Sequence, residues 1–210
     1  MQITAKRKTA ESSIVVKLGF EARLAEPKKM LQTTMPFLNH MLEHVIWRGE
    51  FNLEVNVEME DFYLSHVVCE DIGSTMGVAA RKVLENRLEE GVKGYGYAFA
   101  VIDEAFCRAV ISFENRAYLD LNPADGVVIP PETENTLSED LKTFFEGFVQ
   151  GAACTLHLDI LKGENGHHIW EATFRAFGEA LSNAFELQDW RKGITPGVAG
   201  PLNIEVEREG

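Results

Sequence analysis

Two adjacent histidines, His167 and His168, stand at the predicted start of a helix and are followed by Glu171. His167 and Glu171 are four residues apart, so a helix places them on one face. His168 lies about 100° further round such a helix, so its ring can serve a different centre. Imidazole and carboxylate ligands together suit Mn, Fe, Co, Ni or Zn. A solvated helix start with two surface histidines is the alternative interpretation.

The same spacing occurs 101 residues earlier in the chain. His66 and Glu70 repeat the pair, and Gly77 falls in the same phase as Gly178. A repeat of about half the chain indicates a duplicated module rather than a solenoid, whose repeats span about 20–50 residues. Two metal sites, each based on one His/Glu pair, are therefore predicted, and their natural chemistry is Lewis-acid or metal-bound-base catalysis.

Three further histidines are candidate ligands. His40 and His44 are four residues apart on a predicted helix, so they share one face. Exposure, or a satisfied contact in the core, is the alternative for both. We expect His40, His157 and His168 to complete the two sites. Packing of the two halves, or assembly of several subunits, would bring the His/Glu helices together.

Hydrophobic periodicity predicts the elements that position these residues. Predicted helices cover 36–48, 66–84, 138–153 and 167–187, and predicted strands cover 2–8, 13–20, 51–59, 94–102, 105–113, 155–160 and 202–206. Each half has the order strand–strand–helix–strand–helix. This order predicts an α+β fold built by tandem duplication, each half a mixed sheet with helices on one face. We expect the halves to be residues 1–91 and 92–210, joined as one integrated unit.

Composition narrows the class of protein. The chain of 210 residues has a net charge of −13 and no basic stripe, which argues against a nucleic-acid partner. The N-terminal segment lacks the apolar core of a signal peptide, and no apolar run reaches the length of a membrane span. The three cysteines are widely spaced, as is typical of reduced thiols. We therefore expect a cytoplasmic protein with no membrane partner.

Several of these segments together resemble the imidazoleglycerol-phosphate dehydratase family of histidine biosynthesis, over nearly the whole chain. The matching motifs contain arginine, histidine and acidic residues in the order of the family's motifs. They are residues 7–12, 37–42, 66–71, 103–104, 115–116 and 163–175.

The resemblance implies a duplicated module like ribosomal protein S5 domain 2, a two-manganese site assembled between subunits, and a homo-oligomer of 24 subunits. It implies loss of water from imidazole glycerol phosphate, a small-molecule substrate, to give imidazole acetol phosphate. Carried onto this chain, Glu11 and Glu171 are candidate catalytic residues, and Arg116 and Arg175 are candidate phosphate-binding residues. The metal ligands would be His40, His66, Glu70, His157, His167, His168 and Glu171.

Some positions depart from the family pattern near the metals. Val67 replaces the second histidine of the first motif, and valine cannot bind a metal. Because Val67 is the counterpart of His168, we expect the centre of His167 and Glu171 to lose that ligand. His44, where the family usually has glutamine, is a candidate replacement. Asn39 replaces an aspartate of the family, and this replacement weakens the hydrogen-bonding support for the neighbouring His40.

The phosphate end departs as well. Gly94 stands for a family arginine, and the loop 196–200, with Gly197 and Ala199, has neither the hydroxyl nor the lysine of the family. Three hypotheses follow: an active dehydratase with a weakened metal site, a diverged paralogue for a different or unphosphorylated substrate, and a non-catalytic metal-binding assembly protein.

Overall fold

The computed structural model describes residues 1–59 and 63–200. The first half contains β1 (Gln2–Lys8), β2 (Ser12–Gly19), β3 (Leu31–Gln32), α1 (Pro36–Gly49), β4 (Asn52–Met59) and α2 (Ser65–Arg87). The second contains β5 (Tyr95–Ile102), β6 (Ala105–Ser112), β7 (Tyr118–Pro123), β8 (Glu132–Thr133), β9 (Thr136–Leu137), α3 (Ser138–Ala152), β10 (Thr155–Lys162) and α4 (Gly166–Phe185). The strand predicted at 202–206 lies outside the described residues.

The two large sheets share one topology. Their strand orders are β1-β2-β4-β3 and β5-β6-β10-β7, so each strand of one sheet has a counterpart in the other. In each sheet the last strand pairs in parallel and the others pair antiparallel, which makes both sheets mixed. The predicted duplication is confirmed. The predicted division between residues 91 and 92 stays a prediction, and falls in the connection between α2 and β5.

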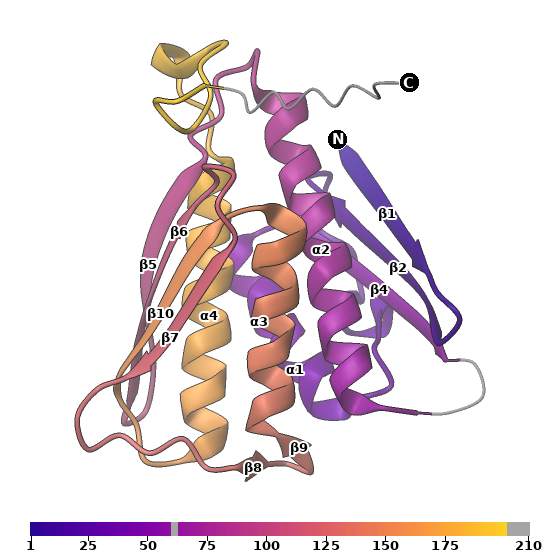
Figure 1. Cartoon of the computed structure of the whole chain (residues 1–210), viewed down its shortest axis with the longest axis vertical. Coiled ribbons are helices and arrows are strands. Elements are labelled where there is room, and N and C mark those ends of the chain that lie inside the picture. The colour runs from indigo at the N-terminus through magenta and orange to yellow at the C-terminus, as the bar shows by residue number, and fades with distance from the viewer. Residues whose placement is uncertain (60–62, 201–210) are drawn as a thin grey trace, which may run out of the picture.

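Four helices lie between the two sheets (Figure 1). Buried and less buried side chains alternate along the strands, which explains this arrangement. Every second side chain is buried against the helices. In β2 these are Ile14, Val16 and Leu18, and in β10 they are Leu156, Leu158 and Ile160. Each half buries only one face of its sheet. The shared interior is therefore a helix double layer covered by sheets on both sides.

Helix packing crosses between the halves. Helix α2 packs against α3, and α4 packs against α1. Gly73 and Gly147 let α2 and α3 approach closely: a Cβ atom at Gly73 would lie 2.0 Å from the carbonyl oxygen of Phe144. The two helices that carry the His/Glu pairs thus belong to different helix pairs. Packing of the two halves in one chain does not unite those pairs, because each helix faces the first helix of the other half.

An ion pair between a partly exposed arginine and a buried aspartate attaches the first sheet to α2. Arg7 on β1 bonds to Asp71, which is almost fully buried, and the hydroxyl of Ser12 donates to the same carboxylate at 2.7 Å. Two of the motifs singled out in the sequence, residues 7–12 and 66–71, therefore meet through this carboxylate. Breaking such a pair leaves a buried charge without a partner.

Among residues 1–59 and 63–200, the helices are too short or too polar to span a membrane.

Candidate metal centre

The starts of α1 and α4 are fixed by local hydrogen bonds. Ahead of α1, the side-chain oxygen of Asn39 accepts from the backbone N–H and the hydroxyl of Thr33, at 3.0 and 2.7 Å. Ahead of α4, the Asn165 side chain caps the helix and accepts from the N–H groups of His167 and His168. Asn39, inside α1, thus ties the preceding segment to that helix, while Asn165 caps α4.

Three imidazole rings converge on one carboxylate at this interface. The Nε2 atoms of His40, His44 and His167 lie 3.6, 3.3 and 3.3 Å from the same oxygen, Oε2 of Glu171. His40 and His44 come from α1, and the other two residues come from α4. We call these four residues the histidine–glutamate group. Within it, ligand atoms of His40, His44 and Glu171 lie within 4.8 Å of one another.

Arg175 balances the charge of Glu171, which is only 4% exposed. The guanidinium group bonds to Oε1 of Glu171, the oxygen other than the one that the histidines approach. It also donates to the carbonyl of Val101 at 3.0 Å and approaches Nδ1 of His44 at 3.4 Å. A buried carboxylate needs such a partner. Arg175, which the resemblance offered as a phosphate-binding residue, therefore contacts the histidine–glutamate group.

Burial lowers the pKa of His44 to about 4. Desolvation is the main cause, the charge of Glu171 opposes it, and the positive charge of His40, Arg175 and then His167 lowers the pKa further. The ring is therefore neutral at pH 7, and a neutral imidazole is the form that binds metal ions.

The spacing of the donors fits a bound ion. Ligand atoms about 2.1 Å from a metal lie about 3.0 Å apart in octahedral geometry and about 3.4 Å apart in tetrahedral geometry. The separations of 3.3–3.6 Å between the imidazole nitrogens and Glu171 are close to these values. Nitrogen-rich ligands with one carboxylate favour Mn, Fe, Co, Ni or Zn over Mg or Ca.

A cavity of about 530 Å³ opens beside this group. It lies between the starts of α1 and α2 and the turn that joins β8 to β9, and His40 and His167 reach its wall. Glu134 on that turn lies 3.5 Å from Nδ1 of His167. The cavity gives a small molecule access to the imidazole nitrogens.

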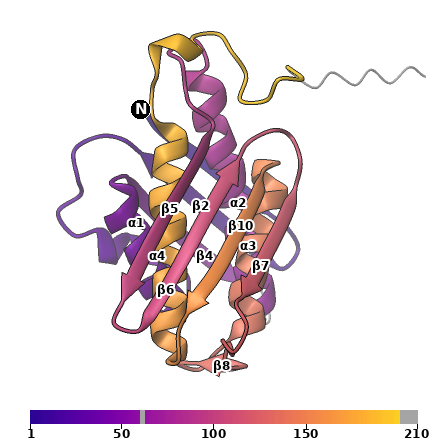
Figure 2. The ribbon, with the colours of Figure 1, turned by 90° about the vertical axis from the view of Figure 1, so that its left-hand side faces the viewer.

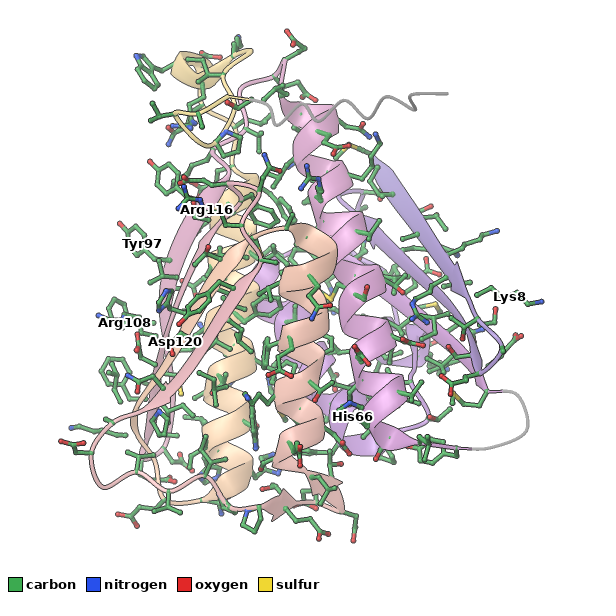
Figure 3. All side chains as sticks on the ribbon, viewed as in Figure 1. Lys8, His66, Tyr97, Arg108, Arg116 and Asp120 are labelled. Atoms are coloured by element: carbon green, nitrogen blue, oxygen red, sulfur yellow. The ribbon has the colours of Figure 1, made fainter. Side chains whose placement is uncertain are left out.

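The other predicted pair, His66 and Glu70, has a different environment. His66 is exposed at the first turn of α2 (Figure 3), and its Nδ1 atom lies 3.9 Å from a carboxylate oxygen of Asp140. Asp140 is 97% buried, and its second oxygen has no hydrogen-bond partner in the described part of the chain. Among residues 1–59 and 63–200, no set of three ligands gathers around His66 and Glu70.

His168 points to a different partner from His167, as its place on the helix predicted. Its Nδ1 atom lies 2.8 Å from Glu104, in the turn between β5 and β6. The N–H of Asn165, then His168, lowers the pKa of Glu104 to about 2, and the bond to Glu104 raises the pKa of His168. In the single chain His168 therefore anchors the start of α4 and stands apart from Glu171.

His157 and Glu11 lie away from the histidine–glutamate group. His157 is on the outer face of the second sheet, 3.2 Å from Asp120, while the helices cover the inner face. Glu11 is exposed in the turn between β1 and β2. Any role of either residue in this centre would require a second chain.

Arg116 lies at the other end of the molecule from the start of α4 (Figures 1 and 3). With Arg81 it lines a cavity of about 260 Å³ that also includes Glu85, Glu114 and the 195–200 loop. Gly94 has a positive φ of 73°, and a Cβ atom there would lie 2.3 Å from the ring of Pro196. Thus Gly94 packs against that loop, where a larger side chain would collide.

His44, which the sequence offered only as a candidate replacement, lies within this group, because it is one helical turn from His40 and faces the same way. Glu104 belongs to a motif that the sequence singled out, but its contact with His168 was not predicted. Glu134 had no local signal, since it approaches His167 from a separate turn.

Comparison with known proteins agrees with this geometry. The family model described as Imidazoleglycerol-phosphate dehydratase matches residues 33–181. The chain is 37% identical over 197 residues to the imidazoleglycerol-phosphate dehydratase of Burkholderia cenocepacia, covering 93% of this chain and 96% of that protein. The corresponding protein of Thioalkalivibrio sulfidiphilus is 36% identical over 197 residues, with 93% and 95% coverage.

Two solved structures have the same fold. The imidazoleglycerol-phosphate dehydratase of Staphylococcus aureus superposes with a TM-score of 0.72 at 26% identity, covering 90% of this chain and all of that chain. The enzyme from Pyrococcus furiosus, solved in complex with (S)-C348, gives a TM-score of 0.74 at 29% identity, with 94% and 99% coverage. With its matching motifs, fold and histidine–glutamate group, this chain belongs to the imidazoleglycerol-phosphate dehydratase family, whose members are metal-dependent lyases.

Proposed function

We propose that this protein removes water from imidazole glycerol phosphate to give imidazole acetol phosphate, in histidine biosynthesis. The observation that carries the proposal is the convergence of three imidazole nitrogens on Glu171, in a chain of the dehydratase family. We further propose that the metal is manganese and that each chain contributes to two sites, the second based on His66 and Glu70.

Metal binding and proton transfer are assigned to different residues. His40, His167 and Glu171 hold the ion beside the 530 Å³ cavity. An ion held there would supply Lewis-acid stabilisation to the deprotonated imidazole ring of the substrate, and the electron density of that ring would help to expel hydroxide from the neighbouring carbon. Glu171 is buried and bonded to Arg175, so we assign it to metal binding rather than to proton transfer. A proton acceptor must come from elsewhere, and Glu11 of a neighbouring subunit is our candidate.

We also propose self-assembly into a homo-oligomer of 24 subunits. The outer face of the second sheet, which faces the viewer in Figure 2, supports assembly because it carries several exposed apolar side chains. Its side chains are 40–60% exposed: Tyr95, Tyr97, Phe99, Val101, Val110 and Tyr118. The equivalent face of the first sheet is polar. Exposed apolar patches of this kind mark interaction sites. Assembly would also bring Glu11, His157 and Arg116 of one chain to the site of another.

Two further proposals concern the chain as a whole. We propose that the protein is cytoplasmic, which is supported by three buried cysteines with free thiols. We also keep the division into halves at residues 91 and 92, which is supported by the equivalent order of strands in the two sheets.

The activity is tested with purified protein, imidazole glycerol phosphate and Mn²⁺, by following formation of the enolisable product. We expect turnover by the wild type and at least a 100-fold loss in Glu171→Gln, because outer-shell changes alone cost about 10–100-fold. Glu179→Gln is the matched control, since it makes the same change at an exposed position of α4. Metal binding without any product would instead support a non-catalytic assembly protein.

A second candidate function is dehydration of an unphosphorylated substrate. The cavity around Arg116 favours it, because Arg81 and Arg116 are balanced by Glu85 and Glu114, and the 195–200 loop adds no positive charge. Each lost charged contact to phosphate costs about 1.5–3 kcal/mol. Comparing kcat/KM for imidazole glycerol with and without the phosphate decides between them: a preference for the unphosphorylated compound would establish the second function.

A further inference from the structure

We propose that His44 is a metal ligand, and that α1 and α4 of one chain supply His40, His44 and Glu171 to a single divalent transition-metal ion. The inference rests on the metal dependence in the proposed function, and it does not depend on turnover. It adds a ligand and makes this centre independent of a ligand from a neighbouring subunit.

Distances carry the first step. Nε2 of His44 lies 3.4 Å from Nε2 of His40 and 3.3 Å from Oε2 of Glu171, and His40 lies 3.6 Å from the same oxygen. These three atoms form a nearly equilateral triangle. Two of its edges match the distance of about 3.0–3.4 Å between neighbouring ligands of one ion, and the third, 3.6 Å, is slightly longer. An ion placed over the triangle contacts all three atoms, and His167 approaches Glu171 at 3.3 Å.

The second argument concerns which of these nitrogens can donate a hydrogen bond. Two imidazole nitrogens that face each other can bond only if one carries a hydrogen and the other does not. Both nitrogens also face a carboxylate oxygen, which only accepts. A nitrogen without a hydrogen directs its lone pair at the carboxylate, and two nitrogens that both carry hydrogens donate to the carboxylate but point these hydrogens at each other across 3.4 Å. A cation between the three atoms removes this conflict, because every donor atom then faces positive charge.

Arg175 limits but does not prevent this arrangement. Its Nε–H approaches Nδ1 of His44 at 3.4 Å, a long contact, while its shorter bonds go to Glu171 and Val101. A His44 ring that binds metal through Nε2 carries its hydrogen on Nδ1. Binding must therefore break the contact between Arg175 and His44, and the guanidinium keeps its other two partners.

The internal repeat explains why an extra ligand is needed. Val67, the counterpart of His168, has no donor atom, so the first turn of α2 offers one histidine where α4 offers two. His44 provides an imidazole from within the same chain. The ion at this centre then needs no contribution from residue 67 of any chain.

The test compares His44→Gln with wild type as the assembled protein. Metal is stripped with a chelator, and Mn²⁺ is then titrated while free Mn²⁺ is followed by EPR. We expect His44→Gln to weaken binding at this centre at least about tenfold. Arg48→Gln, one turn further along α1 and partly exposed, is the matched control and should bind Mn²⁺ like the wild type. Equal affinity of His44→Gln and wild type would overturn the proposal.

A second measurement needs no variant. Crystals of the wild type soaked in Mn²⁺ should show an anomalous peak bonded to Nε2 of His44, with Arg175 turned away from Nδ1. A peak on His40 and Glu171 with His44 still bonded to Arg175 would contradict the proposal. Neither measurement uses substrate, so a chain that binds Mn²⁺ through His44 without turnover would refute only the proposed function.

Discussion

The two helix pairs of this molecule have the same backbone plan and different side chains. In α2 and α4 alike, the second residue is histidine and the sixth is glutamate: His66 and Glu70 in one, His167 and Glu171 in the other. The packing partners differ. The fifth and ninth residues of α1 are His40 and His44, whereas those of α3 are Lys142 and Glu146.

This difference explains why a ligand set forms at one interface. In the α1–α4 pair, the fifth and ninth residues add two imidazoles to the His/Glu pair of α4. In the α2–α3 pair, the same positions hold an ion pair, with Lys142 and Glu146 3.0 Å apart. A lysine ammonium has no lone pair for a metal. Within one chain a duplicated His/Glu pair is therefore insufficient, and the facing helix decides whether that chain alone gathers a set of three ligands.

The largest expected effect is a gain of metal binding in the α2–α3 pair. Lys142→His combined with Glu146→His should give this pair a Co²⁺ site made within one chain, seen by its visible absorption, because four ligands would then match those of the α1–α4 pair. Lys142→Gln with Glu146→Gln is the control and should add none. If the histidine variant also adds none, the close glycine-lined spacing of α2 and α3 prevents the site, whatever the side chains.

The free energy of unfolding should show that α2 and α3 lie closer together than α1 and α4. In Gly73→Ala the new Cβ would lie 2.0 Å from the carbonyl oxygen of Phe144, against 2.7 Å from that of Val45 in Gly178→Ala. We expect a loss of about 3 kcal/mol for the first and about 1 kcal/mol for the second, within the usual range for overpacking. Urea unfolding with the metal chelated measures both. Equal losses would mean that the two interfaces are equally tight.

The smallest effect should be a pH dependence of stability that arises at the start of α4, from Glu104 and His168. The start of α2 has no equivalent, because Val67 is the counterpart of His168 and does not titrate. The pKa of Glu104 is lowered to about 2 in the folded protein. Its contribution to the stability of the folded state is therefore complete above the unfolded pKa of about 4.5, and this stability is lost as pH falls through 2. The pKa of His168 is raised, so its contribution is complete below about 6.5 and is lost above its folded pKa.

Thermal unfolding of metal-free protein tests this dependence. The difference in Tm between wild type and Glu104→Gln should be largest between about pH 4.5 and 6.5. It should vanish toward pH 2 and shrink, without vanishing, at high pH, because Glu104 still accepts from the N–H of Asn165. A difference that keeps growing above pH 7 would contradict the assignment of His168 as its partner.

Much of the fold was predictable from local patterns. Helices and strands followed from hydrophobic spacing, and the duplication followed from a repeat of His66, Glu70 and Gly77 in the second half. The sequence did not predict the β8–β9 hairpin, whose Glu134 approaches His167, because two-residue strands carry no periodicity. The site was predictable in part: His40 and His167 meet at Glu171, while His157 and His168 have other partners in the single chain.

The sequence alone determined the chemistry available to this protein, because histidine and glutamate four residues apart share a helix face wherever that helix packs. It also determined that there are two such faces. Only the tertiary structure decided that α4 faces α1 and α2 faces α3, since contacts between distant helices depend on how both halves bury their sheets. That choice brought His44 to Glu171, and it left His66 and Glu70 without a third ligand within the described part of one chain.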